Sequence, residues 1–280
     1  MQTPVNYPFR ILALDVDGTL IGESKLLEPS IVTAIRKAES QGVIVVIATG
    51  RRLRTSMDVI NPLGAGSYLI QSSGAVIRSI SNQSILHEKF IPKTVAEELV
   101  QLVRKFQATA VWYDTPNRSG KLFVFGKIER NRPLEIYSQP NPTAFVEATS
   151  FTGLENAMEI VVFGDTQQLR QLRSAIASRF KNTLKVISWN SPKYSGLVLE
   201  VLHSNVSKGS SLEWLATSLD IPRESVAAIG DAENDVEMIA WAGLGVGISS
   251  GVPKLRQVSD ILIPPPERLG VANYLESLTR

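Results

Sequence analysis

ILALDVDGTL, residues 11–20, places two acids one residue apart directly after an apolar run. If residues 9–15 form a strand, its side chains alternate, so Asp15 and Asp17 lie on the same side at its carboxyl end. Open α/β sheets bind their ligands at this edge. Gly18 gives the chain room to turn there. The letters DVDG are also typical of an ordinary turn, and this segment alone leaves that alternative open.

Composition narrows the possible functions. The 280 residues are 44% apolar, enough to form one large domain or two of ordinary size. Lys and Arg number 29 against 27 Asp and Glu, so the net charge of +2 provides no basic field for nucleic acid. There is no cysteine and only two histidines, so any metal must bind to oxygen ligands. The N-terminus lacks a signal-peptide pattern, and the longest apolar run, residues 43–48, is too short to span a bilayer. We expect a cytoplasmic protein without a membrane partner.

Apolar runs of strand length alternate with segments of helical period in both outer parts of the chain. Residues 29–41 begin with a proline and repeat apolar residues on one helical face. Residues 42–50 form a β-branched run without polar alternation, which is typical of a strand covered on both faces. Further strands are expected at 67–71, 225–231, 245–249 and 260–263. This alternation predicts an α/β fold with a mainly parallel sheet.

The middle of the chain differs from the outer parts in its pattern of expected strands and helices. Strand-like pieces at 110–114, 121–126, 159–165 and 183–189 are combined there with helical periods at 93–106 and 166–180. The polar stretches 79–84 and 188–196 bracket this region, and such stretches are typical of domain crossings. We therefore expect a second α/β domain, residues 84–189, inserted into a core formed by residues 1–83 and 190–280.

Three further segments carry polar residues where a strand ends or a helix begins. They supply Thr49 with Gly50, then Lys208, and then Asp231 with Asn234 and Asp235. Each has an ordinary structural explanation: strands commonly end in Thr-Gly, a single helical lysine is usually solvated, and Asp231 suits a helix cap. Because polar residues recur at several strand ends and helix starts, we favour the interpretation that they form one shared site.

Together the segments DVDGTL, VIVVIATGR, KGSSLEWLA and GDAENDVEM resemble the four motifs of the haloacid dehalogenase superfamily of phosphotransferases. The chain is most similar to the Cof-type phosphatases, whose large inserted α/β cap is of the C2B type. This resemblance extends over nearly the whole chain. It implies a Rossmann-like, doubly wound parallel-sheet core with a C2B cap.

The resemblance also implies roles for individual residues. Asp15 is the nucleophile that forms an aspartyl phosphate, and Asp17 is the general acid and then the base. Mg2+, which suits an all-oxygen site, is assigned to the carboxylates of Asp15 and Asp231 and the backbone carbonyl of Asp17. Asp235 orients this site from outside the ligand set. The phosphoryl oxygens are then bound by Thr49, Gly50, Lys208, Asn234 and the backbone N–H of Val16.

The expected function is a Mg2+-dependent phosphatase that acts on a small phosphorylated metabolite, with a sugar phosphate as the favoured substrate. A sugar phosphomutase of the same fold and a phosphosugar sensor without turnover are the alternatives. Two departures from the family pattern put the choice of substrate in doubt. Ser73 stands where relatives often have Asn, and GISSG, residues 247–251, stands where Asn-Ala is frequent. The sequence predicts neither the substrate nor the oligomeric state.

Substrate selection is expected from the inserted domain, because the motifs supply contacts mainly to the phosphoryl group. The stretch SWNSPKYSG, residues 188–196, combines an indole, an amide, an ammonium and a phenol. The candidate residues are Trp189, Asn190, Lys193 and Tyr194. Packing of the two aromatic residues within the domain is an equally good explanation for this stretch.

Overall fold

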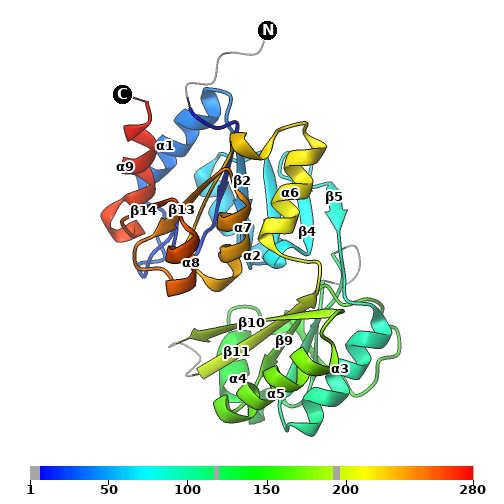
Figure 1. The fold of residues 1–280 in the computed structure, drawn as a ribbon. Coiled ribbons are helices and arrows are strands. Elements are labelled where there is room, and N and C mark those ends of the chain that lie inside the picture. Colours follow the sequence, from blue (N-terminus) through cyan, green and yellow to red (C-terminus); the bar gives the residue numbers. More distant parts are fainter. Residues whose placement is uncertain (1–6, 117–119, 192–195, 280) are drawn as a thin grey trace. The chain divides into compact units, whose positions relative to one another are not determined.

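The computed structural model describes residues 7–116, 120–191 and 196–279, which form two compact units (Figure 1). The core unit comprises Met1–Glu88 and Ser207–Arg280, and the inserted unit comprises Lys89–Val206. Within the described ranges, no helix is long and apolar enough to cross a membrane.

The core unit is built on an eight-stranded sheet with the strand order β14-β13-β12-β1-β2-β3-β4-β5. Pairing is parallel from β14 to β3, and β4 and β5 are added as antiparallel strands at one edge. The strands are β1 Ile11–Leu14, β2 Ile44–Ala48, β3 Tyr68–Gln71, β4 Val76–Ser79, β5 Ile85–Glu88, β12 Val226–Gly230, β13 Leu244–Ile248 and β14 Ile261–Ile263. The helices are α1 Pro29–Ser40, α2 Leu53–Leu63, α6 Lys208–Ser218, α7 Val236–Trp241, α8 Pro253–Val258 and α9 Gly270–Ser277.

Helices cover both faces of this sheet. Along β1, Leu12 and Leu14 face one hydrophobic core with α1, α2 and α9, while Ile11 and Ala13 face a second core with α6, α7 and α8. All four side chains of β1 are fully buried, which explains the apolar run without polar alternation. In α1 the predicted apolar face is the buried one. The predicted doubly wound α/β core is therefore confirmed.

The inserted unit contains a six-stranded, mostly antiparallel sheet with the order β10-β11-β9-β6-β7-β8. Its strands are β6 Thr109–Tyr113, β7 Leu122–Phe125, β8 Phe145–Glu147, β9 Ile160–Phe163, β10 Leu184–Ser191 and β11 Gly196–His203. Its helices are α3 Lys93–Lys105, α4 Arg132–Ser138 and α5 Thr166–Arg179. One sheet face, including Trp112, packs against α3 and α5 in a separate hydrophobic core. The expected second α/β sheet is thus present.

The boundaries between the units differ from the sequence prediction. The polar stretch 79–84 joins β4 to β5, which pair antiparallel within the core unit. The predicted boundary between residues 189 and 190 is wrong, because it falls inside β10. This strand pairs with β11 through an eight-residue antiparallel register that extends from Leu184 and His203 to Ser191 and Gly196. Trp189 and Asn190 therefore belong to a strand pair of the inserted unit, and the chain returns to the core unit at Ser207.

Candidate active site

A fully buried lysine lies at the centre of the candidate site in the core unit. Ser207 caps α6 in a reciprocal capping box with Ser210, and this fixes Lys208 in the first turn of the helix. The Nζ atom of Lys208 donates to Oδ1 of Asp15 and to Oδ1 of Asp235, at 2.6 Å in each case. The Lys208 side chain is 0% exposed, so these two carboxylates stabilise its positive charge in place of water.

The carboxyl end of β12 brings a further acid to the same place. Oδ1 of Asp231 accepts a hydrogen bond from the Thr19 hydroxyl at 2.9 Å. Oδ2 of Asp235 accepts the backbone amides of Asp231 at 3.1 Å and of Ala232 at 3.0 Å. Both oxygens of Asp235 are therefore engaged, which suits the predicted role of orienting its neighbours. Gly18 has φ +91°, and a Cβ atom there would lie 2.3 Å from Oδ2 of Asp231, so only glycine allows this approach.

Negative charge is in excess at this cluster. Ligand oxygens of Asp15, Asp231 and Asp235 lie within 4.8 Å of one another, and the single ammonium of Lys208 leaves two charges unbalanced. Burial, Asp235 and Asp231 raise the pKa of Asp15 well above its usual value, although Lys208 opposes them. Burial and the charge of Asp235 likewise raise the pKa of Asp231 to about 6.

These residues fit a divalent cation. Oδ2 of Asp15 is buried and has no hydrogen-bond partner among the described residues. A dication would match the two excess charges, and the all-oxygen donor set suits Mg2+. Asp15 and Asp231 could hold such an ion, and the backbone carbonyl of Asp17 remains the predicted third ligand.

The side chain of Asp17 is held outside this cluster by an arginine. Arg51 Nε and Nη2 donate to the two Asp17 carboxylate oxygens, at 2.7 Å each. Arg51 is in turn fixed by a 3.1 Å hydrogen bond from Nη1 to the Thr55 carbonyl. Burial acts to raise the pKa of Asp17, but the hydrogen bonds and charge of Arg51, with a smaller contribution from Lys25, lower it. In this arrangement Asp17 is an ionised acceptor.

The predicted phosphoryl-binding residues lie on neighbouring loops of the core unit. Thr49 is buried at the end of β2, and its Oγ1 accepts the Arg51 amide at 3.1 Å. The carbonyl of Val16 accepts the amides of Leu20 and Ile21, at 2.9 Å each, which closes the turn after β1. Asn234 precedes Asp235 in a short 3-10 turn, where its Nδ2 donates to Ser73 Oγ at 3.2 Å. A Cβ atom added to Gly50 would lie within 3.5 Å of both of these polar groups.

The predicted substrate-selecting residues belong to the inserted unit. Trp189 and Asn190 lie in β10, opposite Val198 and Leu197 of β11. Trp189 is partly buried and makes other contacts within the structure. Lys193 and Tyr194 lie outside the described residues. Selection of substrate by this stretch stays a prediction.

Arg51 and Thr19 also contact the acids of this site, although the sequence pattern does not predict it. Both were visible as letters of the quoted motifs, since Arg51 follows Thr49-Gly50 and Thr19 follows Gly18. Their partners, however, lie 34 and 212 residues away in the chain. Nothing in the local pattern indicates pairings of this kind.

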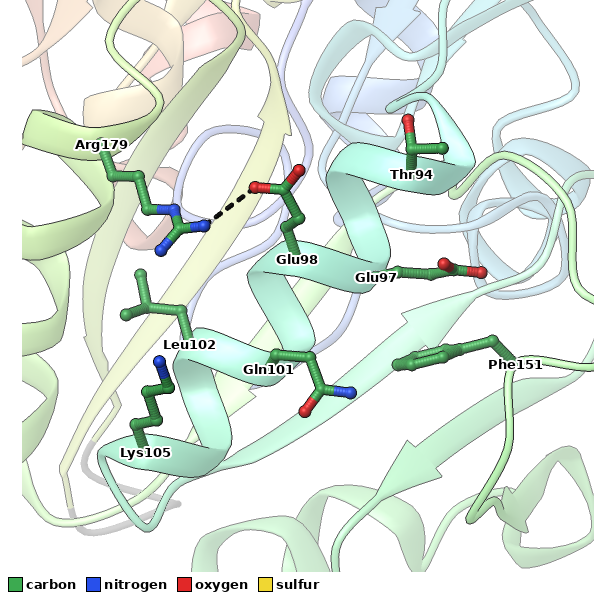
Figure 2. A pocket seen from close by; sticks show the side chains of 8 residues that line it. All are labelled: Thr94, Glu97, Glu98, Gln101, Leu102, Lys105, Phe151 and Arg179. Carbon is green, nitrogen blue, oxygen red and sulfur yellow. Dashed lines mark hydrogen bonds and ion pairs between the residues drawn. The ribbon is translucent and has the colours of Figure 1, made fainter.

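A surface hollow of about 480 Å3 lies on the inserted unit along α3. Figure 2 shows Thr94, Glu97, Glu98, Gln101, Leu102 and Lys105 projecting from this helix beside Phe151 and Arg179. Glu98 accepts a hydrogen bond from Arg179 at 3.0 Å, and both side chains are more than half exposed. The hollow along α3 is lined by solvated charges of both signs. The cluster around Lys208 instead brings buried, oppositely charged groups together, so we assign the candidate active site to that cluster.

Comparison with known proteins agrees with this arrangement. The profile of the haloacid dehalogenase-like hydrolases matches residues 12–275. A 5-amino-6-(5-phospho-D-ribitylamino)uracil phosphatase of Bacillus subtilis is 22% identical over 267 residues, which cover 95% of this chain and 96% of the relative. A phosphoglycolate phosphatase of Methanothermobacter thermautotrophicus is 28% identical over 264 residues, covering 94% and 96%. The solved structure of a sugar phosphatase of HAD subclass IIB superposes with a TM-score of 0.77 at 16% identity, covering 96% and 98%.

An α/β core that brings Asp15, Lys208 and Asp231 together at one sheet edge fits a hydrolase that acts on phosphorylated compounds. Because the family profile spans almost the whole chain, the chain belongs to the haloacid dehalogenase-like hydrolases. The family predicted from the motifs is confirmed, and so is the enzyme class, a phosphatase of that family.

Proposed function

We propose that this chain is a Mg2+-dependent phosphomonoester hydrolase that works through an aspartyl phosphate on a small phosphorylated metabolite. The observation that carries this proposal is the buried Lys208 ammonium, 2.6 Å from both Asp15 and Asp235, beside an Asp15 oxygen without a hydrogen-bond partner among the described residues. A carboxylate nucleophile repels a phosphate dianion unless fixed positive charge lies beside it. Lys208 supplies such a charge.

In the proposed reaction, a carboxylate oxygen of Asp15 bonds to phosphorus while the bond from phosphorus to the ester oxygen breaks. The departing oxygen takes a proton from Asp17, so the alcohol leaves neutral. Asp17 then accepts a proton from water as the water oxygen attacks phosphorus. The bond between Asp15 and phosphorus breaks, inorganic phosphate leaves, and both acids return to their starting states.

Proton transfer by Asp17 requires a change from the described arrangement. Its carboxylate is paired with Arg51 through two 2.7 Å hydrogen bonds, which favour the ionised form. To act as an acid, Asp17 must leave Arg51 and take up a proton. The Arg51 pair therefore represents the chain without substrate, and Asp17 carries its proton at the start and at the end of each turnover.

Mg2+ would be held by Asp15, Asp231 and the backbone carbonyl of Asp17. When bound, it supplies charge neutralisation for the phosphoryl group. Asp235 holds the Asp231 and Ala232 amides and Lys208 in place. Thr49, Gly50, Asn234 and the Val16 amide bind the phosphoryl oxygens.

We propose a sugar phosphate as the substrate within the broader class of small phosphorylated metabolites. The support is the similarity in fold to a sugar phosphatase, together with relatives that are named as phosphatases of other small phosphorylated compounds. Trp189, Asn190, Lys193 and Tyr194 are the residues we propose for selecting among such substrates.

The test is release of inorganic phosphate from an aryl phosphate and from a panel of phosphorylated sugars and organic acids. We expect release with Mg2+ and none after chelation. Intramolecular transfer without free phosphate would identify a phosphomutase instead. Binding of phosphosugars without any turnover would identify a sensor, and either result would overturn the proposal.

A further inference from the structure

A short turn after β3 has an uncommon backbone. Ser72, Ser73 and Gly74 have φ values of +47°, +50° and +112°, three left-handed residues in succession. Serine rarely adopts this region, and such strain persists where the surroundings fix the backbone. Both serines are 0% exposed. Strain of this kind is concentrated at functional sites, so the contacts of the turn need an explanation.

The turn is packed between two loops of the candidate site. The Ser73 amide donates to the Thr49 carbonyl and the Ser72 amide to the Arg51 carbonyl, at 3.1 Å each. A Cβ atom on Gly74 would lie 2.3 Å from the carbonyl oxygen of Ser207, the residue that precedes Lys208. The backbone of the turn therefore connects the segment Thr49–Arg51 to the start of α6.

The Ser73 hydroxyl adds a third loop. Its Oγ accepts Nδ2 of Asn234 at 3.2 Å. A Cβ atom built on Gly50 would lie 3.4 Å from this Oγ and 3.5 Å from Nδ2 of Asn234. The two side chains thus meet beside Gly50, which is itself exposed.

We propose that Ser73 is a positioning residue that fixes the side-chain amide of Asn234 for binding a phosphoryl oxygen beside Gly50. The proposal rests on the proposed function, in which Asn234 and Gly50 bind the phosphoryl group. One N–H of the amide is directed to Ser73, and the other is left for the ligand. An amide ordered in advance loses less freedom when the ligand binds.

The test compares single-hydroxyl deletions in the same turn. Loss of the Ser73 hydroxyl in Ser73→Ala should raise KM for an aryl phosphate and the inhibition constant of inorganic phosphate by about three- to tenfold, the effect of ordering one side chain. We expect kcat to stay within about twofold, since the reacting groups are unchanged. Ser72→Ala is the matched control, because the Ser72 hydroxyl is buried in the same turn and has no hydrogen-bond partner in the described part of the chain.

Two further variants separate positioning from folding. In Ser73→Gly the left-handed backbone is relaxed, so Tm should rise while phosphate binding is weakened as in Ser73→Ala. In an Asn234→Ala background, Ser73→Ala should have no additional effect, because the proposed action passes through Asn234. A purely structural role would give additive losses that follow Tm.

The proposal is overturned if Ser73→Ala binds phosphate like the wild type, if Ser72→Ala shows the same loss, or if the losses add in the double variant. These outcomes leave wild-type hydrolysis intact and concern Ser73 alone. A wild-type chain that neither hydrolyses the aryl phosphate nor binds phosphate in the presence of Mg2+ would overturn the proposed function together with this inference.

Discussion

At the scale of single residues, the buried ammonium of Lys208 opposes the burial and the neighbouring acids that favour the protonated form of Asp15. Removing one partner of a buried charged pair costs about 3–5 kcal/mol, so the pair is kept only where its charges are used or well compensated. Here both partners of Lys208 are carboxylates at 2.6 Å, and burial together with the neighbouring acids raises the pKa of Asp15. A nearby cation would stabilise the ionised form of Asp15, and in that form its carboxylate can attack a phosphoryl group.

Asp15→Asn should abolish turnover without unfolding the chain. The amide keeps the shape of the carboxylate and relieves its repulsion from Asp231 and Asp235, but it cannot act as the nucleophile. We expect kcat on an aryl phosphate to fall by several decades, on the order of 1,000-fold or more, with Tm unchanged or raised. The exposed Asp220→Asn serves as the control and should keep wild-type kcat. Retention of about a tenth of the activity in Asp15→Asn would exclude the nucleophile role.

Arg51→Ala should raise the pKa of Asp17, because the two hydrogen bonds and the positive charge that stabilise its ionised form are removed. The measurement is a carboxyl 13C NMR titration of the metal-free protein. Arg51→Lys should give an intermediate value, since an ammonium keeps the charge but not the paired geometry. The exposed Arg54→Ala should leave the titration unchanged. An unchanged Asp17 pKa in Arg51→Ala would contradict the pairing.

The sign for stability follows from the lowered pKa of Asp17. Its contribution is present above the unfolded-state value, near 3.8, and is lost as the pH falls through the folded value. Because the Asp17 side chain is 45% exposed, we expect the pair to contribute no more than about 1 kcal/mol. Arg51 is therefore expected to matter more for the state of Asp17 than for the fold.

At the scale of elements, strand ends explain which site residues the sequence could predict. Asp15 and Asp231 follow β1 and β12, which pair in parallel, so their carboxyl ends meet at one edge of the sheet. The strand pattern of the sequence and the positions of the motifs are enough to predict that Asp15 and Asp231 lie at the same sheet edge. The pairing of Arg51 with Asp17 depends on rotamers, which the spacing does not determine. Trp189 and Asn190 show the converse, because the polar letters around them predict a domain crossing, whereas both residues pair with β11 inside the inserted unit.

The capping box of α6 should contribute measurably to stability. Ser207→Ala removes the side-chain acceptor of the Ser210 amide, a 3.0 Å hydrogen bond at the helix start. We expect the free energy of unfolding to fall by about 1 kcal/mol, the usual cost of losing an N-cap. Ser218→Ala, at the other end of the same helix, should cost less, because its hydroxyl donates to the Leu215 carbonyl and does not cap the helix start. Equal losses in denaturant titrations of the two variants would contradict a special role for the cap.

At the scale of the whole molecule, the charge cluster should couple the proposed binding of Mg2+ to pH. The pKa of Asp231 is raised to about 6 by burial and by Asp235. Between the unfolded value near 3.8 and this folded value, Asp231 binds more protons in the metal-free native chain than in the unfolded chain. Asp231 therefore destabilises the metal-free fold above about pH 6, and this cost is relieved as the pH falls.

Bound Mg2+ should reverse the pH dependence of the stability of the fold. Binding of the ion to the native state raises Tm by mass action, and the rise should be large near about pH 8 and shrink as the pH falls through about 6. Thermal unfolding with and without Mg2+ across this range gives the measurement. In Asp231→Asn the pH dependence of the Mg2+ effect should be much reduced. A Mg2+-induced rise in Tm that is equal at about pH 5 and about pH 8 would contradict the assignment of Asp231.

The position of β1 in the sheet has a consequence for biosynthesis. One edge of β1 pairs with β2, which is made soon afterwards, but the other edge pairs Ile11 with Val226 of β12. The whole inserted unit, Lys89–Val206, is translated between these two strands. The inserted unit is continuous in sequence, so the ribosome can release all of its strands before β12, the second partner of β1, has been made. Until β12 emerges, the nascent chain exposes an apolar strand edge of the kind that recruits other chains. We therefore expect a chain that contains β1 to β3 but ends before Val226 to be prone to aggregation, and it lacks the Asp231 carboxylate.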